Sequence, residues 1–196
     1  MYFYQLEIPG AIMMYSTKKG NALFNRRFKP IFQKQVHSHN ITNIDENAPV
    51  TGDGLISSRK DVCLGLKVAD CLPVFLFNEK KICAIHCGWR GIASGIADQA
   101  KRFMIDYQYV LGASIGPCCY EIKPDVEKIF ADHDPGTIQK RNGRVFLDLK
   151  TAVIGVLGRD KLIADLPWCT KCRNDIFYSY RAGDKEHRNY AVICKT

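Results

Sequence analysis

The sequence lacks any apolar stretch long enough to cross a membrane as a helix. Its longest apolar stretches, such as CLPVFLF at 71–77, fall far short of the roughly 18–20 residues that a membrane span needs. The start of the chain contains no basic segment followed by a long apolar core, so no secretory signal is predicted. Internal repeats, low-complexity tracts and linkers are missing as well. We therefore expect a single cytoplasmic domain over residues 1–196.

An excess of acidic residues is also absent. The chain has 28 Lys and Arg against 20 Asp and Glu, a formal net charge of +8 at pH 7. Such a balance favours an anionic partner, for example a nucleic acid, phosphate or a phosphorylated metabolite. The densest basic group, residues 16–30, lacks the regular aromatic residues of a single-strand binding groove. Dedicated nucleic-acid binding is therefore not expected.

Cysteine is plentiful, but the pattern of a disulfide framework is missing. The nine cysteines are an odd number, and the chain is long enough to bury a core without cross-links. We expect reduced thiols, most of them buried as small hydrophobic side chains. The CTKC segment at 169–172 has no second CxxC or paired His nearby. The adjacent Cys118 and Cys119 are not expected to complete a site with it, so we predict a structural pair of thiols there.

Strands outnumber helices in the pattern of apolar residues. Alternating or continuous apolar runs predict strands at 2–8, 11–17, 30–36, within 51–57, and at 62–69, 72–77, 81–87, 109–116 and 189–195. Apolar spacings of three and four residues predict helices at 91–107, 123–133 and 148–161, the last with Asp148 as its N-cap. Because the strands are mostly grouped together, we expect an α+β fold with a mixed β-sheet core and flanking helices.

Three residues at the ends of predicted strands are candidates for chemistry. His37, Cys71 and His86 are 34 and 15 positions apart, a spread expected of a site assembled across a sheet. A thiolate with two imidazoles suits Zn²⁺, and three protein ligands leave a fourth position open. The same residues could instead be a cysteine nucleophile with its base, or ordinary core residues. Spacing alone does not decide between these interpretations.

The strings around these residues resemble one known family. They occur in a fixed order along the chain: QVHS (35–38), GDGLIS (52–57), VADCLPV (68–74), AIHCGWRG (84–91), SIGPCCYEI (114–122), DL (148–149), CTKC (169–172) and FYSYR (177–181). Together they closely resemble the laccase-domain family, the YfiH-like proteins, over about four fifths of the chain. The succession of ADC-P, HxGWRG and IGPCCYE is the most specific part of the resemblance.

The resemblance implies a fold, a metal site and an activity. The fold would be a layered α/β/β/α arrangement, and the metal site would be zinc held by His37, Cys71 and His86, with copper as a possible substitute. The activity would be phosphorolysis of adenosine, inosine or methylthioadenosine at these three catalytic residues, with adenosine deamination as a side activity. A multicopper laccase is not expected, because five histidines are too few for its linked copper centres.

Four further residues are candidates for binding substrate or phosphate. Arg90 follows His86 at the expected start of a helix near Gly91, where a guanidinium and free N–H groups suit an anion. The alternative is that Arg90 pairs with Asp70, itself a candidate for proton transfer or for support of the ligands. The other two candidates are Lys18 and Arg188.

The N-terminal part of the sequence departs from the family pattern. The resemblance places a TRxGG turn and a later Asn-Arg segment before QVH, but this chain has STKKGN at 16–21 and a short run to QVH. Lys18 stands where Arg is expected, which keeps the charge but loses the bidentate fork.

We expect purine nucleoside and phosphate as partners and a monomer or homodimer. A cysteine hydrolase using Cys71 and His86, a non-catalytic protein of cell-wall quality control and a weak copper polyphenol oxidase remain alternatives.

Overall fold

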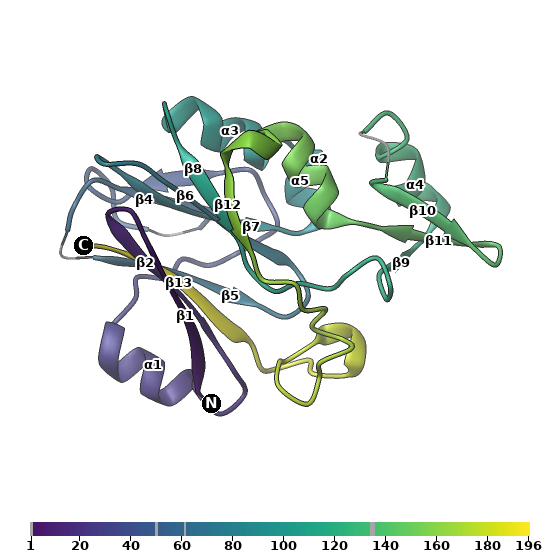
Figure 1. Cartoon of the computed structure of the whole chain (residues 1–196), viewed down its shortest axis with the longest axis horizontal. Coiled ribbons are helices and arrows are strands. Elements are labelled where there is room, and N and C mark those ends of the chain that lie inside the picture. The colour runs from purple at the N-terminus through teal and green to yellow at the C-terminus, as the bar shows by residue number, and fades with distance from the viewer. Residues whose placement is uncertain (1, 50, 61, 134–135) are drawn as a thin grey trace.

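The computed structural model describes residues 2–49, 51–60, 62–133 and 136–196. Three β-sheets and a small number of helices form the fold (Figure 1). The predicted α+β class with a mixed sheet core is confirmed. Within the described residues, no helix has both the length and the apolar composition that spanning a membrane would take.

The largest sheet has six strands in the order β12-β8-β6-β7-β4-β3. Its strands are β3 (Ile41–Asn43), β4 (Gly54–Ser57), β6 (Leu72–Phe77), β7 (Ile82–Cys87), β8 (Gln108–Leu111) and β12 (Leu162–Asp165). Every residue of the central strands β6 and β7 is buried. Both faces of this sheet are therefore covered, which explains why these strands read as continuous apolar runs rather than as alternating ones.

A four-stranded sheet packs against one face of the six-stranded sheet. It has the order β1-β2-β13-β5, with β1 (Phe3–Ile8), β2 (Ala11–Ser16), β5 (Cys63–Val68) and β13 (Asn189–Lys195). The hairpin of β1 and β2 is formed as predicted, with register pairs from Phe3 and Ser16 to Ile8 and Ala11. Side chains of both sheets, including Phe75, Ala84 and Leu66, share one buried cluster between them.

Helices cover the outer faces of the two packed sheets. The helices α2 (Trp89–Ala93), α3 (Ile96–Phe103) and α5 (Leu149–Leu157) pack on the other face of the six-stranded sheet. The helix α1 (Asn21–Phe28) packs through Phe24 on Met14 and Val192 of the four-stranded sheet. In Figure 1, α2, α3 and α5 lie above the sheets and α1 lies below them. The layers are therefore α/β/β/α, as the family resemblance implied.

Several predicted elements differ in detail. The single helix predicted at 91–107 is two helices, because Gly95 adopts a φ of +86° between α2 and α3. The segment 30–36 forms isolated bridges rather than a strand. Ile31 pairs with Leu64 of β5, whereas Lys34 pairs with Thr51, so the segment does not stay beside one partner strand. The Asp148 side chain caps α5 as predicted, accepting from the N–H groups of Lys150 and Thr151.

Other elements were not predicted from the sequence. They are α1, the strands β3 and β12, and a small sheet of β10 (Ile138–Arg141), β11 (Arg144–Leu147) and β9 (Glu121–Ile122) beside the short helix α4 (Pro124–Ile129). Their strands have two to four residues, and the burial of β10 is intermediate or low. Strands this short and this exposed leave too little apolar alternation to recognise.

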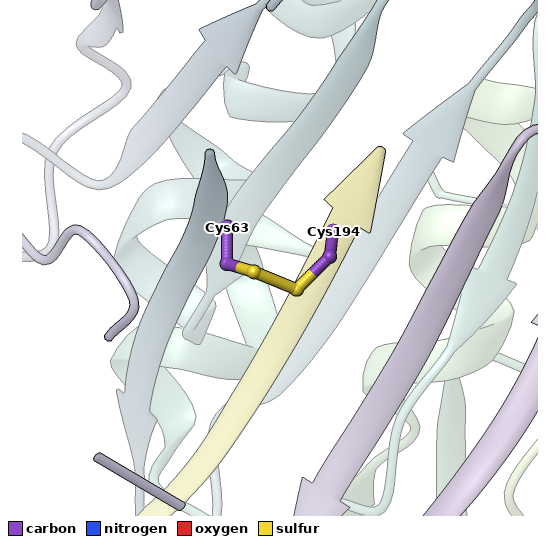
Figure 2. The surroundings of a disulfide bond; sticks show 2 residues. All are labelled: Cys63 and Cys194. Atoms are coloured by element: carbon purple, nitrogen blue, oxygen red, sulfur yellow. A yellow bond between two sulfur atoms is a disulfide. The ribbon is translucent and has the colours of Figure 1, made fainter. Parts of the chain in front are cut away.

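The expectation that all nine cysteines are reduced is wrong for two of them. Cys63 on β5 and Cys194 on β13 form a disulfide across 131 residues of sequence (Figure 2). The two residues are direct partners in the antiparallel register of these strands. This pairing depends on which strands lie side by side in the sheet, so the spacing of the cysteines along the sequence does not reveal it. The other seven cysteines are free.

Candidate functional site

His37, Cys71 and His86 meet at one point of the fold. Their ligand atoms all lie within 4.8 Å of one another. The Cys71 Sγ is 3.8 Å from His37 Nε2, and the two imidazole ring centroids are 4.9 Å apart. Cys71 ends the connection between β5 and β6, where the chain passes from one sheet to the other, and His86 lies on β7. The structure thus brings together three residues that the sequence separates by 49 positions.

The backbone around the three residues is shaped to bring them close. His37 and Asp70, the residue before Cys71, both have left-handed backbone conformations, with φ of +62° and +89°. A Cβ atom at Gly88 would lie 2.9 Å from His37 Cδ2 and 3.0 Å from Cys71 Sγ. Left-handed residues other than glycine are costly and persist where surrounding contacts fix them. The cluster therefore depends on two strained residues and on a glycine that leaves it room.

Asp53, at the start of β4, holds the histidine and the loop of the site together. Its carboxylate is fully buried and accepts from His86 Nδ1 at 2.8 Å. Its second oxygen accepts from the N–H groups of Val36 and Ser38 and from the Ser38 hydroxyl. These contacts flank His37 on both sides. One carboxylate therefore orients His86 and fixes the loop that carries His37.

The charges of the cluster support one another. Burial opposes ionisation of Cys71, but the neighbouring His86 and His37 outweigh it and lower the thiol pKa to about 6. Burial likewise opposes protonation of His86, but Cys71 and Asp53 raise its pKa to about 9. The His86 hydrogen bond and the loop N–H groups hold the pKa of Asp53 below its usual range despite its burial. Between these values the metal-free site holds a thiolate beside an imidazolium.

The residues fit a zinc ion. One thiolate and two imidazoles are the donor set that zinc accepts, with distances of about 2.0–2.3 Å to each ligand atom. Asp53 accepts from the Nδ1 side of His86, which fixes the tautomer and leaves Nε2 free to bind a metal. Because Gly88 has no side chain, the Cys71 sulfur and the His37 ring can both lie close to its backbone. Deprotonation of Cys71 by its surroundings favours metal binding as well.

A pocket of about 660 Å³ opens over this cluster. Three aromatic side chains and five cationic side chains line it together with the cluster: Trp89, Tyr120 and Tyr180, and Lys34, Lys67, Arg90, Arg181 and Arg188. Among the described residues of the lining, Asp70 is the one carboxylate. A second hollow of about 910 Å³ lies around the β6–β7 turn and Ile105, away from the cluster. The pocket over the cluster thus combines flat apolar surfaces with positive charge.

The four predicted binding residues are placed differently from one another. Arg90 and Arg188 line the pocket. Asp70 also borders it, and each of its oxygens accepts one hydrogen bond, from the Thr170 hydroxyl at 2.7 Å and from the N–H of Arg181 at 2.7 Å. The alternative pairing of Arg90 with Asp70 is not formed, and Arg90 lies over the Trp89 ring. Lys18 is outside the lining and pairs with Asp184 at 3.3 Å.

Sequence reasoning missed Asp53 and Arg181. Asp53 lies inside the recognised string GDGLIS, where a carboxylate next to an apolar strand is itself a signal of a buried polar role. Arg181 ends the string FYSYR, and its guanidinium lies over the Tyr120 ring, 4.9 Å from the centroid. No pattern in the sequence links Arg181 to Tyr120, because their contact depends on the fold of two distant loops.

Comparisons with known proteins agree with the fold and show the family. A family model described as multi-copper polyphenol oxidoreductase laccase matches residues 18–196. A purine nucleoside phosphorylase from Aquifex aeolicus is 29% identical over 155 residues, covering 76% of this chain and 73% of that protein. One from Borreliella burgdorferi is 29% identical over 220 residues, covering 97% and 95%. The crystal structure of Bacillus licheniformis hypothetical protein YfiH matches the whole chain and 97% of its own, with a TM-score of 0.86 at 20% identity.

Proposed function

This chain belongs to the family described as multi-copper polyphenol oxidoreductase laccase, and from that premise we propose that it is a zinc-dependent purine nucleoside phosphorylase. The substrates would be adenosine, inosine or methylthioadenosine with inorganic phosphate, and the products the free base and ribose 1-phosphate. The observation that carries the proposal is the pocket over His37, Cys71 and His86, with its aromatic and cationic walls. Two relatives that bear the name purine nucleoside phosphorylase support the same activity.

The walls of the pocket meet the two needs of phosphorolysis. The reaction places a phosphate against a sugar that develops positive charge while the base departs. Arg90, Arg181 and Arg188 bring guanidinium groups to one pocket, and guanidinium is the side chain that grips phosphate oxygens in pairs. The helix α2 has five residues, so its dipole adds little and these side chains would hold the anion. Trp89 and Tyr180, which are partly exposed and exposed, offer flat surfaces against which a purine ring can stack, and the buried Tyr120 supports Arg181.

His37, Cys71 and His86 would hold the zinc ion at the floor of the pocket. When bound, the ion supplies a Lewis acid and lowers the pKa of water at its open position. Asp53 would keep the Nδ1 proton of His86 in place, so that Nε2 points to the metal position. Asp70 would act by positioning, since its oxygens tie Thr170 and the Arg181 backbone to the residue before Cys71.

The pocket favours phosphorolysis over adenosine deamination. Deamination requires a carboxylate that moves a proton at the reacting carbon. Among the described residues that line the pocket, the carboxylate is Asp70, and both its oxygens already accept hydrogen bonds. Each of these oxygens keeps a second lone pair, so a side deaminase activity would need Asp70 to take up a proton there while it still holds Thr170 and the Arg181 backbone. Copper in place of zinc would match the donor set of two His and one Cys, and would give the weak polyphenol oxidation of the alternative.

A cysteine hydrolase is the second candidate, and one observation favours it. Asp53, His86 and Cys71 lie in the order carboxylate, imidazole and thiol, and the Cys71 pKa is lowered to about 6. This is the arrangement of an activated cysteine nucleophile. Chelation distinguishes the two functions, because it removes zinc-dependent activity but leaves a metal-free thiol nucleophile working.

The test measures base release from inosine and adenosine by the purified protein, with and without phosphate, before and after chelation. We expect release that requires phosphate, is lost with chelator and is restored by zinc. Cys71→Ala should lose it, whereas Cys83→Ala, which removes a buried thiol outside the site, should keep it. Arg181→Ala should raise the KM for phosphate about 10-fold or more, and Arg102→Ala on the exposed side of α3 should not. Bound zinc without turnover would overturn the proposal in favour of a non-catalytic role.

A further inference from the structure

Four other cysteines converge at a second point of the fold. Cys118, Cys119, Cys169 and Cys172 place their sulfur atoms within 4.8 Å of one another. The Cys172 sulfur is 3.6 Å from that of Cys118 and 3.4 Å from that of Cys119. The prediction of a simple pair of structural thiols at 169–172 is therefore wrong, because the two adjacent cysteines do reach the CxxC segment.

We propose that these four cysteines form a closed structural zinc site, separate from the pocket. Tetrahedral zinc with four thiolates has metal–sulfur distances of about 2.3 Å, so its sulfurs lie roughly 3.8 Å apart. The observed separations of 3.4 and 3.6 Å, with every pair within 4.8 Å, surround that value. Four thiolates fill the coordination of the ion and leave no open position, which is the mark of a structural rather than a catalytic site.

The turn that carries Cys118 and Cys119 explains how adjacent residues can share one ion. On a strand, neighbouring side chains point to opposite faces. Here the N–H groups of Cys119 and Tyr120 both donate to the carbonyl of Gly116. This bond pattern is that of one helical turn, in which successive side chains are separated by roughly 100°. Both sulfurs can therefore face the same side.

The CxxC segment meets this turn in a defined register. Ser114 and Cys169 form a parallel bridge, and the N–H of Thr170 donates to the Ser114 carbonyl at 3.0 Å. A Cβ at Gly116 would lie 3.3 Å from the Cys118 sulfur and 3.4 Å from the Cys169 Cβ. The backbone at Gly116 thus passes close to the sulfurs of both segments. The cluster is enclosed by main chain on one side, as a zinc knuckle is.

A metal ion explains the cluster better than disulfides or an iron–sulfur cluster. The chain forms its disulfide at Cys63 and Cys194, whereas all four of these thiols are free. Two of them are exposed, and exposed unligated thiols next to one another are open to oxidation. An iron–sulfur cluster inserts several metal ions and sulfides between the cysteines, for which the present separations are too short. One zinc ion, bound with release of the thiol protons, suits all four.

The site would join two loops that lie next to one wall of the pocket. Tyr120 follows Cys119 directly, and Thr170 lies inside the CxxC segment and donates to Asp70. Arg181 donates through its Nη1 atom to the carbonyl of Glu121 at 3.0 Å. A metal between the loops would therefore fix the aromatic and cationic residues of that wall without contacting substrate.

The test is metal analysis of the full chain, purified without chelator, with its cysteine variants. We expect about two equivalents of zinc per chain in the native protein. Cys172→Ser should lose about one equivalent, Cys71→Ser the other, and the double variant both. Cys83→Ala serves as the matched control, since it removes a thiol outside both clusters, and it should keep both equivalents.

A second measurement works on the native protein and does not depend on the folding of a variant. After replacement of zinc by Co²⁺, thiolate-to-metal absorption should report mostly the four-thiolate site and persist in Cys71→Ser. Bound metal should protect the four thiols from alkylation until chelator is added. The proposal is refuted if Cys172→Ser keeps all its zinc, if peptide mapping finds a disulfide within the four, or if iron is the metal bound. None of these outcomes decides whether the chain is a phosphorylase, which is tested separately at Cys71.

Discussion

Replacing Asp53 by asparagine tests whether this carboxylate sets the His86 tautomer that can bind a metal. Asp53 offers one oxygen to His86 Nδ1 and the other to the loop donors of Val36 and Ser38. In Asp53→Asn the amide oxygen can serve the loop, which leaves the NH₂ group facing His86 Nδ1. The imidazole must then accept at Nδ1 and carry its proton on Nε2. A protonated Nε2 cannot bind a metal.

The size of the effect follows from the contacts that change. Loss of such a supporting partner typically costs 10–100-fold in metal affinity, or about 1.4–2.7 kcal/mol. The charge-assisted hydrogen bond of this buried pair becomes a neutral one as well, which should lower the free energy of unfolding of the metal-free protein by roughly 1 kcal/mol. The His86 pKa, about 9 in the native chain through Cys71 and Asp53, should fall because the Asp53 carboxylate is gone.

Asp45→Asn is the matched control. Asp45 accepts from the Ser57 and Ser58 hydroxyls and from the Ser58 N–H. Hydroxyl groups can rotate to accept as well as donate, so the amide should be tolerated and zinc affinity should stay within about twofold. Affinity is measured by competition with a chromophoric chelator, taking Cys71→Ser as the baseline for metal bound elsewhere. Native zinc affinity in folded Asp53→Asn would refute this reasoning.

Three further predictions concern the thiols and the space around them. In chelated protein, the alkylation rate of Cys71 should rise with a midpoint near pH 6 rather than at the usual thiol pKa of 9.0, because the thiolate is the reactive form. Bound zinc should block the alkylation. A rate midpoint near pH 9 would contradict the charge arrangement of the site. Cys63→Ser should lower the free energy of unfolding by up to about 5 kcal/mol through the 131-residue loop that the bond to Cys194 closes; unchanged denaturation midpoints with and without reductant would count against it. Gly88→Ala should fold, since its φ of −77° suits alanine, yet bind zinc weakly because the new Cβ meets the His37 ring; normal zinc content would show that the site has more room.

The sequence predicted the parts of the fold whose signal is local. The strands at 72–77 and 81–87 were predicted within a residue of β6 and β7 because both are continuous apolar runs, buried on both faces. The α5 cap was predicted because Asp148 precedes an apolar helical pattern. Helix α1 was missed because its segment reads as basic, and its contact with the sheet is made through Phe24. Eight residues make only about two turns, which is too short for an amphipathic period to stand out.

The site was predicted through recognisable strings rather than through geometry. Spacing alone left His37, Cys71 and His86 open between a metal site, a nucleophile with its base and core residues. Asp53 was missed because its partners His86 and Ser38 lie 33 and 15 positions away. Long-range hydrogen bonds of this kind leave no periodic trace in the sequence. Only the folded chain shows that one carboxylate serves both.

The disulfide bears on the predicted cytoplasmic location, which stays a prediction. Disulfides are rare in the cytosol, where thiols are kept reduced. The Cys63–Cys194 pair lies on the face of the four-stranded sheet that packs against α1, beside Met14 and Phe24. The pair lies on strands β5 and β13, whereas the four-cysteine cluster lies in loops outside the named strands. The redox state of the pair and the metal content of the cluster can therefore be measured independently.

Asp70 connects the two cysteine sites, and this sets what each one controls. Its carbonyl accepts from the N–H of Ile115 at 2.9 Å, in the loop leading to Cys118, and its carboxylate holds Thr170 and the Arg181 backbone. The left-handed conformation of Asp70, with φ of +89°, is thus fixed from three directions. His86 and the loop of His37 are fixed instead by Asp53, and Cys71 directly precedes β6. Under the proposed function, loss of metal from the four-cysteine site should therefore loosen the pocket wall that carries Tyr120 and Arg181 more than it disturbs His37, Cys71 and His86, so that KM rises before kcat falls.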